Sequence, residues 1–233
     1  MNLMGGIVYR DPERPVGVEL LRAMAARVPG ASEPLLTTSG SIGLLCARGG
    51  KAPKRYQAAV AATDLDLVNF QELRALTGLS RSCDVLVRLY ELEGWQCLRR
   101  LRGAFAVALW DPRQRALWLG VDHFGLRRLY YAATPDAFAF ASRPSALLAV
   151  PGVNGAVDPA IVYQYLNLDC VPAPASVFEG VRRLPPGHML SLRDGVPAVT
   201  PYWDLDYPEK RLGLRAGAAA TAQMVEEAVA ATL

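Results

Sequence analysis

The sequence contains little of the material from which metal sites and nucleic-acid surfaces are built. It has four cysteines and two histidines in 233 residues, and no two cysteines lie two to four positions apart. This spacing disfavours a zinc knuckle, and two histidines exclude a histidine-rich metal site, so we expect no metal centre. The formal net charge is only +3, which is too small to indicate nucleic acid as a partner.

Long apolar runs are missing as well. No run approaches the roughly 18–20 apolar residues that a membrane-spanning helix needs. The N-terminus also lacks the basic segment and apolar run of a secretory signal. We therefore expect a cytoplasmic protein without membrane association, in which the cysteines are reduced and buried.

The sequence is, in contrast, rich in hydrophobic residues. Hydrophobic residues make up 52% of the chain and charged residues 20%, the balance of a globular protein with a sizeable core. The length suits one large domain or two modest ones.

The stretch from residue 101 to 142 organises the chain. It contains four short apolar runs separated by polar turns: Gly103–Trp110, Ala116–Val121, Leu129–Ala132 and Ala137–Ala141. Such runs predict two consecutive antiparallel hairpins, forming a meander. Apolar residues occupy both parities of residues 104–110, so we expect this strand to be covered on both faces, as in a layered domain. The basic pair Arg127-Arg128 between the hairpins is interpreted as part of a solvated turn.

Local signals predict the remaining elements. We expect helices over Val18–Val28, Asn69–Leu76 with Asn69 as N-cap, Ser82–Leu101, Pro144–Val150 and Asp158–Leu168 with Asp158 as N-cap. We expect strands within residues 1–10, 35–47, 56–68 and 181–184, and a last hairpin from Met189–Leu192 and Ala198–Trp203. Residues 1–204 are predicted to form one domain. Residues 205–211 are predicted to be a linker, and residues 212–233 a further helix.

Five motifs carry a family resemblance. They are LRRLRGAFAVALWD (98–111), VDHFGLRRLYY (121–131), FASRPSALL (140–148), FEGVRRLPPGH (178–188) and PYWD (201–204). In this order they resemble the N-terminal glutaminase domain of the asparagine synthetase family, whose members are class II glutamine amidotransferases. The resemblance implies an α+β fold of the N-terminal-nucleophile (Ntn) hydrolase type. That fold is a four-layer αββα sandwich with two antiparallel sheets, which agrees with the doubly covered strand.

The resemblance also implies where the glutaminase residues should lie. The family's nucleophile is a cysteine in the second position, whose free α-amine is the general base. Here MNLMGGIV lies over the family's MCGIAGIV without a gap, and Asn2 takes the place of the cysteine. An asparagine cannot form the thioester, so we expect no catalytic residue in this chain.

The glutamine pocket is also altered. The family's oxyanion pair, Asn-Gly, aligns with Asp64 and Leu65, and its amine-binding aspartate aligns with Ser82. A carboxylate at position 64 would stand where an oxyanion must develop. The nearest basic candidate for the family's arginine is Arg48. These four residues therefore define a degenerate glutamine pocket.

The family's second activity has no counterpart in this sequence. The synthetase domain opens with Ser-Gly-Gly-x-Asp-Ser (SGGxDS), a loop that holds the pyrophosphate of ATP, and this motif is absent here. We expect this chain to bind no cofactor, and ATP with Mg²⁺ to belong to a synthetase domain or subunit that carries SGGxDS. Residues 212–233 are expected to be the first helix of a truncated or split synthetase domain. The sequence leaves open whether the chain forms a homodimer.

Three functions remain as alternatives. The first is a degenerate scaffold for an ATP-dependent amide-forming ligase, as in β-lactam synthetases and the macrolactam synthetases of lasso peptides. In those enzymes an amine within the substrate replaces ammonia. The second is a remnant or fragment of a glutamine-hydrolysing asparagine synthetase. The third is a ligand-binding module that reuses the old pocket, lined by Asp64, Asp66 and Ser82.

Overall fold

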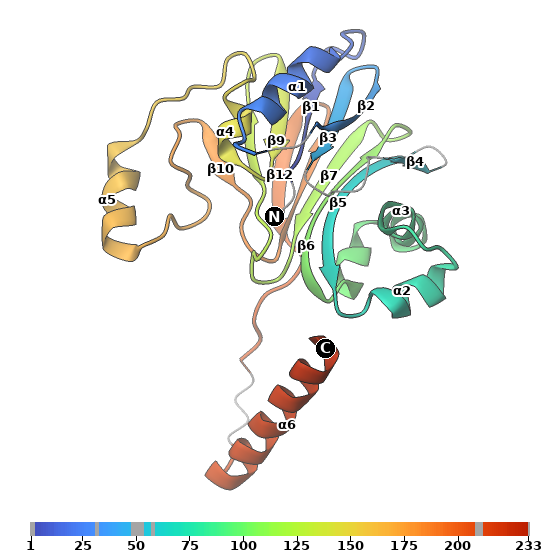
Figure 1. Cartoon of the computed structure of the whole chain (residues 1–233), viewed down its shortest axis with the longest axis vertical. Coiled ribbons are helices and arrows are strands. Elements are labelled where there is room, and N and C mark those ends of the chain that lie inside the picture. Colours follow the sequence, from blue (N-terminus) through green and yellow to red (C-terminus); the bar gives the residue numbers. More distant parts are fainter. Residues whose placement is uncertain (1–2, 31–32, 48–53, 57–58, 208–211, 233) are drawn as a thin grey trace.

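Two antiparallel β-sheets of six strands each lie face to face in the structure (Figure 1). The computed structural model describes residues 3–30, 33–47, 54–56, 59–207 and 212–232. Sheet A has the strand order β10-β8-β9-β1-β3-β2, and sheet B has the order β12-β11-β7-β6-β5-β4. Sheet A comprises β1 (Leu3–Tyr9), β2 (Leu35–Ser39), β3 (Ile42–Ala47), β8 (Tyr130–Ala133), β9 (Ala137–Ala141) and β10 (Val181–Arg183). Sheet B comprises β4 (Lys54–Tyr56), β5 (Ala59–Leu67), β6 (Gly103–Asp111), β7 (Ala116–Val121), β11 (His188–Arg193) and β12 (Val196–Pro201).

Helices cover the outer face of each sheet. Sheet A packs against α1 (Val18–Ala26) and α4 (Pro144–Leu147). Sheet B packs against α2 (Phe70–Thr77), α3 (Ser82–Glu93) and the 3₁₀ helix η1 (Gly94–Arg100). Three apolar clusters result, one between the sheets and one under each helical layer. The predicted four-layer αββα sandwich is therefore confirmed.

The central strand β6 explains the layering. Phe105, Val107 and Leu109 pack toward the helices, whereas Ala108 and Trp110 pack between the sheets. Because successive side chains of a strand point to opposite faces, an apolar residue at every position requires cover on both sides.

The two central hairpins form as predicted, but not as one meander. Strand β6 pairs with β7 in sheet B, and β8 pairs with β9 in sheet A. Residues 122–129 cross from one sheet to the other. Two hairpins that lie side by side in one sheet have the same apolar pattern as two hairpins that face each other from different sheets. The sequence pattern therefore could not distinguish these two arrangements.

Two helix predictions were wrong in detail. The predicted helix Ser82–Leu101 ends at Glu93, because Gly94 has a φ of 60° that starts a separate 3₁₀ turn. Asn69 precedes α2, but its side chain makes no capping hydrogen bond. Instead its amide donates to the carbonyl of Arg100 at 2.9 Å and accepts from the backbone N–H of Arg102 at 3.0 Å.

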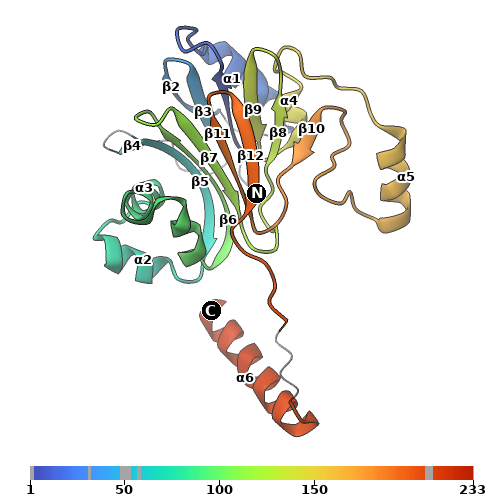
Figure 2. The same ribbon diagram turned by 180° about the vertical axis from the view of Figure 1, so that it is seen from behind.

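Two further helices stand away from the sandwich (Figure 2). One is α5 (Pro159–Leu168), which Asp158 caps as predicted by accepting from the N–H of Ala160 at 2.8 Å. The other is α6 (Leu214–Thr232), which follows β12 in the chain. Among the described residues, no helix combines the length and apolarity needed to cross a membrane.

Candidate functional site

An arginine lies between two carboxylates at the end of the sandwich where β1 begins. Asp64 and Asp66 project from the same face of β5, toward the space between the sheets. Nε of Arg127 lies 3.7 Å from Oδ2 of Asp64, and Nη2 lies 3.8 Å from Oδ2 of Asp66. The side chain of Asp64 is only 3% exposed, that of Arg127 is 23% exposed and that of Asp66 is 80% exposed. Since a buried carboxylate is costly without a compensating charge, Arg127 is an integral part of this site.

The loop after β7 holds Arg127 in place. Asp122 is 1% exposed, and its carboxylate accepts hydrogen bonds from four backbone N–H groups. The donors are Phe105, Phe124, Leu126 and Arg127, at 3.3, 3.1, 2.9 and 2.8 Å. The loop is thereby fixed to β6 and its arginine is aimed at β5.

A tight turn completes this loop. Gly125 has a φ of 67°, and a Cβ at this position would lie 3.0 Å from Cγ of Pro186. A larger residue would be strained by the positive φ and would also have to displace the Pro186 ring.

Aromatic rings line the same loop. The His123 ring meets Trp203 edge to face at a centroid distance of 4.8 Å and Tyr202 at 5.7 Å. Burial lowers the pKa of His123 below its ordinary value of 6.5, against a smaller opposing effect of the Asp122 carboxylate. The hydroxyl of Tyr202 donates to the carbonyl of Val121 at 2.7 Å. The rings therefore fix the start of the crossing segment.

The predicted pocket residues do not all gather on one face. Ser82 lies on the helical side of β5, where its hydroxyl is 3.2 Å from Oγ1 of Thr63. The side chain of Leu65 packs into the apolar cluster on that side too. Asp64 points the other way, into the inter-sheet space. Asn2 and Arg48 lie outside the described residues.

A cysteine lies close to Asp64. Cys46 on β3 pairs with Met4 of β1 and is 1% exposed. Burial raises its pKa to about 12, with smaller contributions from Cys83 and Asp64. At neutral pH this group is a thiol, whereas nucleophilic catalysis needs the thiolate.

Sequence reasoning missed Arg127 and Asp122. The aspartate was detectable in principle, since Asp followed by Gly three residues later marks a turn in which a side chain caps backbone N–H groups. The pairing of Arg127 with Asp64 was not detectable, because it joins positions far apart in the chain. The interpretation of Arg127 as part of a solvated turn was wrong.

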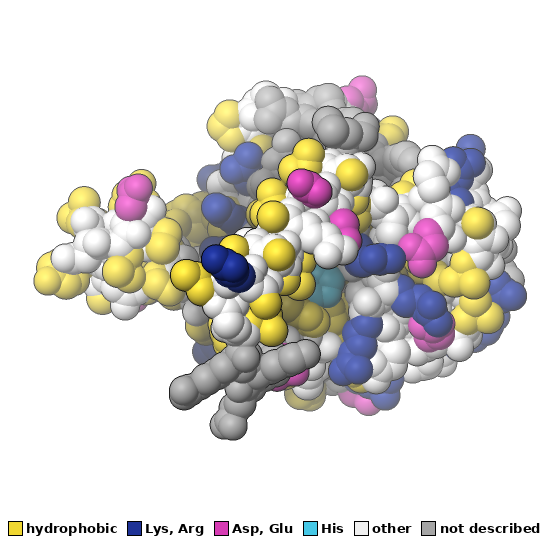
Figure 3. Space-filling model, turned by 90° about the horizontal axis from the view of Figure 1, so that it is seen from below, with side chains coloured by type: hydrophobic (Ala, Val, Ile, Leu, Met, Phe, Trp, Pro, Cys, Tyr) yellow, Lys and Arg dark blue, Asp and Glu magenta, His cyan; other side chains and the backbone are white. Residues whose placement is uncertain are grey.

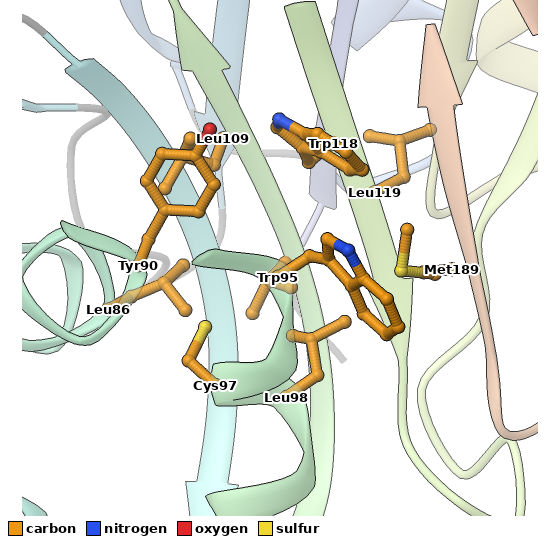
Figure 4. Close-up of a pocket in the computed structure, with 10 residues that line it drawn as sticks. Leu86, Tyr90, Trp95, Cys97, Leu98, Leu109, Trp118, Leu119 and Met189 are labelled. Carbon is orange, nitrogen blue, oxygen red and sulfur yellow. The ribbon is translucent and has the colours of Figure 1, made fainter. Parts of the chain in front are cut away.

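A small cavity under the helical layer of sheet B is a packing gap. It has a volume of about 20 Å³, room for about one water molecule. Figure 4 shows Trp95, Trp118 and Met189 around it, with Cys97 on the helical side. Its lining is almost wholly apolar, so it offers no convergent polar groups to a ligand.

The fold and this end of the sandwich define a class of protein, the Ntn-hydrolase-like αββα domains. The glutamine phosphoribosylpyrophosphate amidotransferase of B. subtilis, in complex with ADP and GMP, has a similar fold. The match has a TM-score of 0.58 and 15% sequence identity over 86% of this chain and 49% of that one. At that identity the likeness shows the fold alone.

Sequence comparison gives the family. A model of the glutamine amidotransferase domain matches residues 57–203, and the chain belongs to this family. An asparagine synthetase (glutamine-hydrolyzing) 3 of Bacillus subtilis is 30% identical over 141 residues, which cover 58% of this chain and 23% of the relative. The amidase chry2 of Gibberella zeae is 31% identical over 130 residues, which cover 55% of this chain and 19% of the relative. The chain thus spans a quarter or less of the length of these relatives.

Proposed function

We propose that this chain is a catalytically degenerate glutamine amidotransferase domain that serves as the scaffold of an ATP-dependent amide-forming ligase. The ligase would be of the β-lactam or lasso-peptide macrolactam synthetase type, in which the attacking amine already belongs to the substrate. Such a ligase needs no ammonia from glutamine. ATP and Mg²⁺ would be held by a synthetase segment that carries SGGxDS.

The observation that carries the proposal is the buried carboxylate of Asp64. An oxyanion hole needs hydrogen-bond donors aimed at developing negative charge, and loss of one donor typically lowers the rate about 10²–10³-fold. Asp64 instead provides a carboxylate at the aligned position, 3.7 Å from the guanidinium of Arg127. The oxygens of this carboxylate accept hydrogen bonds rather than donate them, so they cannot stabilise an oxyanion as a pair of donors would.

The nucleophile supports the same conclusion. Asn2 stands at the aligned position of the family's cysteine. Cys46, which lies near Asp64, is buried and has a pKa of about 12. It therefore offers no thiolate to replace the missing nucleophile.

Exposed apolar helix faces support a scaffold role. Figure 3 shows hydrophobic side chains over the lobe that α5 forms and along α6. On α5 the exposed apolar residues include Tyr163, Tyr165 and Leu166, and on α6 they include Met224 and Val225. A large apolar patch at the surface marks an interaction site, and the synthetase segment is the proposed occupant.

Copurification tests the proposal. A tagged copy of the chain is expected to retain, from its native cells, a stoichiometric polypeptide with the SGGxDS motif. The variant Tyr163→Glu/Leu166→Glu on α5 should lose it. Leu76→Glu, at a leucine on α2 that is 55% exposed, should keep it. Failure to capture such a polypeptide, or equal capture by both variants, contradicts the scaffold role.

A further inference from the structure

A cavity between the sheets lies at the end of the sandwich opposite Asp64. Strand β1 runs from the Asp64 end toward Arg10, and the cavity is bordered by Arg10 and by the turns that precede β3, β7 and β12. Its volume is about 290 Å³. No residue of the site around Arg127 lines it.

The floor of this cavity is apolar and comes from both sheets. Val8 and Phe138 contribute from sheet A, and Trp110 and Leu192 from sheet B. All four are buried. An aromatic or branched aliphatic body placed here would gain contact with both sheets.

The rim is cationic. Arg10 and Arg115 line the mouth, and within the described residues neither side chain makes an ion pair or a hydrogen bond. Among the residues that line this cavity, Asp194 carries the one carboxylate, which leaves a net charge of +1 on these three side chains. Two guanidinium groups with free donors are suited to a carboxylate, which each can bind through two parallel N–H groups.

The hydroxyl of Ser41 faces the same space. Ser41 is 7% exposed and lines the cavity, and its hydroxyl has no hydrogen-bond partner in the described part of the chain. Ser41 therefore has an unused donor and acceptor close to the apolar floor.

Two residues of the cavity rim have a left-handed backbone conformation. Arg115 and Asp194 have φ values of 48° and 49°, and they are two of the three non-glycine residues with positive φ in the described chain. Positive φ is the usual geometry of tight hairpin turns. Both occur in hairpin turns of sheet B and place their side chains at the cavity mouth.

We propose that this cavity binds an organic monoanion, a carboxylate on an aromatic or branched aliphatic body. The body would fill the floor between Trp110 and Phe138, and the carboxylate would meet Arg10 and Arg115. Inorganic phosphate has no apolar part that could pack against the floor of the cavity, so we do not expect it to bind here. The ligand is either a free small carboxylate or the C-terminal carboxylate of a peptide with a large apolar last residue. This site does not depend on the proposed function.

Calorimetric titration with 3-phenylpropionate tests the proposal, with 3-phenylpropionamide as its neutral counterpart. The acid is expected to bind saturably at millimolar concentrations, and the amide about 10-fold or more weakly. An acetylated dipeptide that ends in phenylalanine distinguishes the two sources, since only a peptide site would prefer it to the free acid. Inorganic phosphate should not compete.

Variants localise the binding. Arg10→Gln/Arg115→Gln should weaken the acid about 10-fold or more, and Ser41→Ala should weaken it to a smaller degree. Arg113→Gln, in the same turn as Arg115 but outside the cavity lining, should leave it unchanged. All these sites except Ser41 are exposed, so the variants are expected to fold, which circular dichroism verifies. Absence of saturable binding, equal binding of acid and amide, or unchanged binding by the double variant would overturn the proposal.

Discussion

The backbone N–H of Arg127 donates a 2.8 Å hydrogen bond to Oδ2 of Asp122. It is one of four hydrogen bonds that backbone N–H groups donate to the buried carboxylate of Asp122. Because it holds the backbone of Arg127, it also sets the position from which the Arg127 side chain reaches Asp64. The loop and the carboxylate on β5 are thus parts of one arrangement.

Replacing Asp122 tests this arrangement. Asp122→Ala removes four acceptor contacts from buried or half-buried N–H groups, so the free energy of unfolding should fall by about 3–5 kcal/mol. Urea denaturation measures the change. Asp136→Ala removes an exposed carboxylate that makes only a 3.9 Å ion pair with Arg14, and it should cost under about 0.5 kcal/mol. Equal stability of the two variants would contradict the role of Asp122.

Trp110 tests the packing between the sheets. It is 7% exposed and belongs to the cluster that the two sheets share. Trp110→Ala should lower the free energy of unfolding by about 3–5 kcal/mol, because the cavity left behind cannot collapse fully. Tyr207→Ala, at a ring that is 79% exposed, is the matched control and should have little effect on the melting temperature. An unchanged melting temperature for Trp110→Ala would be inconsistent with the packing described here.

Thiol reactivity should separate the four cysteines. Cys46, Cys83 and Cys97 are buried, and Cys170 is exposed. Burial raises the pKa of both Cys46 and Cys97 to about 12, so at about pH 8 only about one in 10⁴ of these groups is a thiolate. Ellman's reagent should titrate one thiol per native chain rapidly and four after denaturation. A second fast thiol in the native protein would refute the account of Cys46 as inert.

His123 predicts a pH dependence of stability. Its folded pKa lies below the ordinary value of 6.5 because burial disfavours the imidazolium. The unfolded chain therefore takes up the proton at higher pH than the folded one. The stabilisation is complete above about pH 6.5 and is lost as the pH falls through 6.5 toward the folded pKa. Urea midpoints measured from pH 7.5 to 5.5 should fall for the wild type and fall less for His123→Gln; identical slopes would disprove the assignment.

The layered fold was predictable because its signal is local. Residues 104–110 are apolar at both parities, and that pattern alone requires cover on both faces of a strand. The turn at Gly94, which ends α3 early, was harder to predict, since the apolar face continues through Trp95 and Leu98. The role of the Asn69 side chain was also not predictable from local sequence. Its type and position fit an N-cap, but its side chain bonds to residues 100–102, which only the folded chain brings near.

The candidate site was predictable only in part. Asp64 was found through its aligned position, and the structure places it in a buried setting. Its partner Arg127 was not found, because an ion pair between distant segments of the chain produces no recognisable pattern in the sequence. Leu65 and Ser82 are near Asp64 in sequence or alignment, but strand alternation sends Leu65 to the opposite face and Ser82 packs there too.

Glutamine hydrolysis by the purified chain tests the central claim most directly. We expect no glutamate release above the protein-free background and no covalent adduct with the glutamine analogue 6-diazo-5-oxo-norleucine in the intact mass. Asn2→Cys alone should remain inactive, because Asp64 still opposes the oxyanion. Glutamate release that rises with the concentration of wild-type protein and stops after treatment with the analogue would contradict the account.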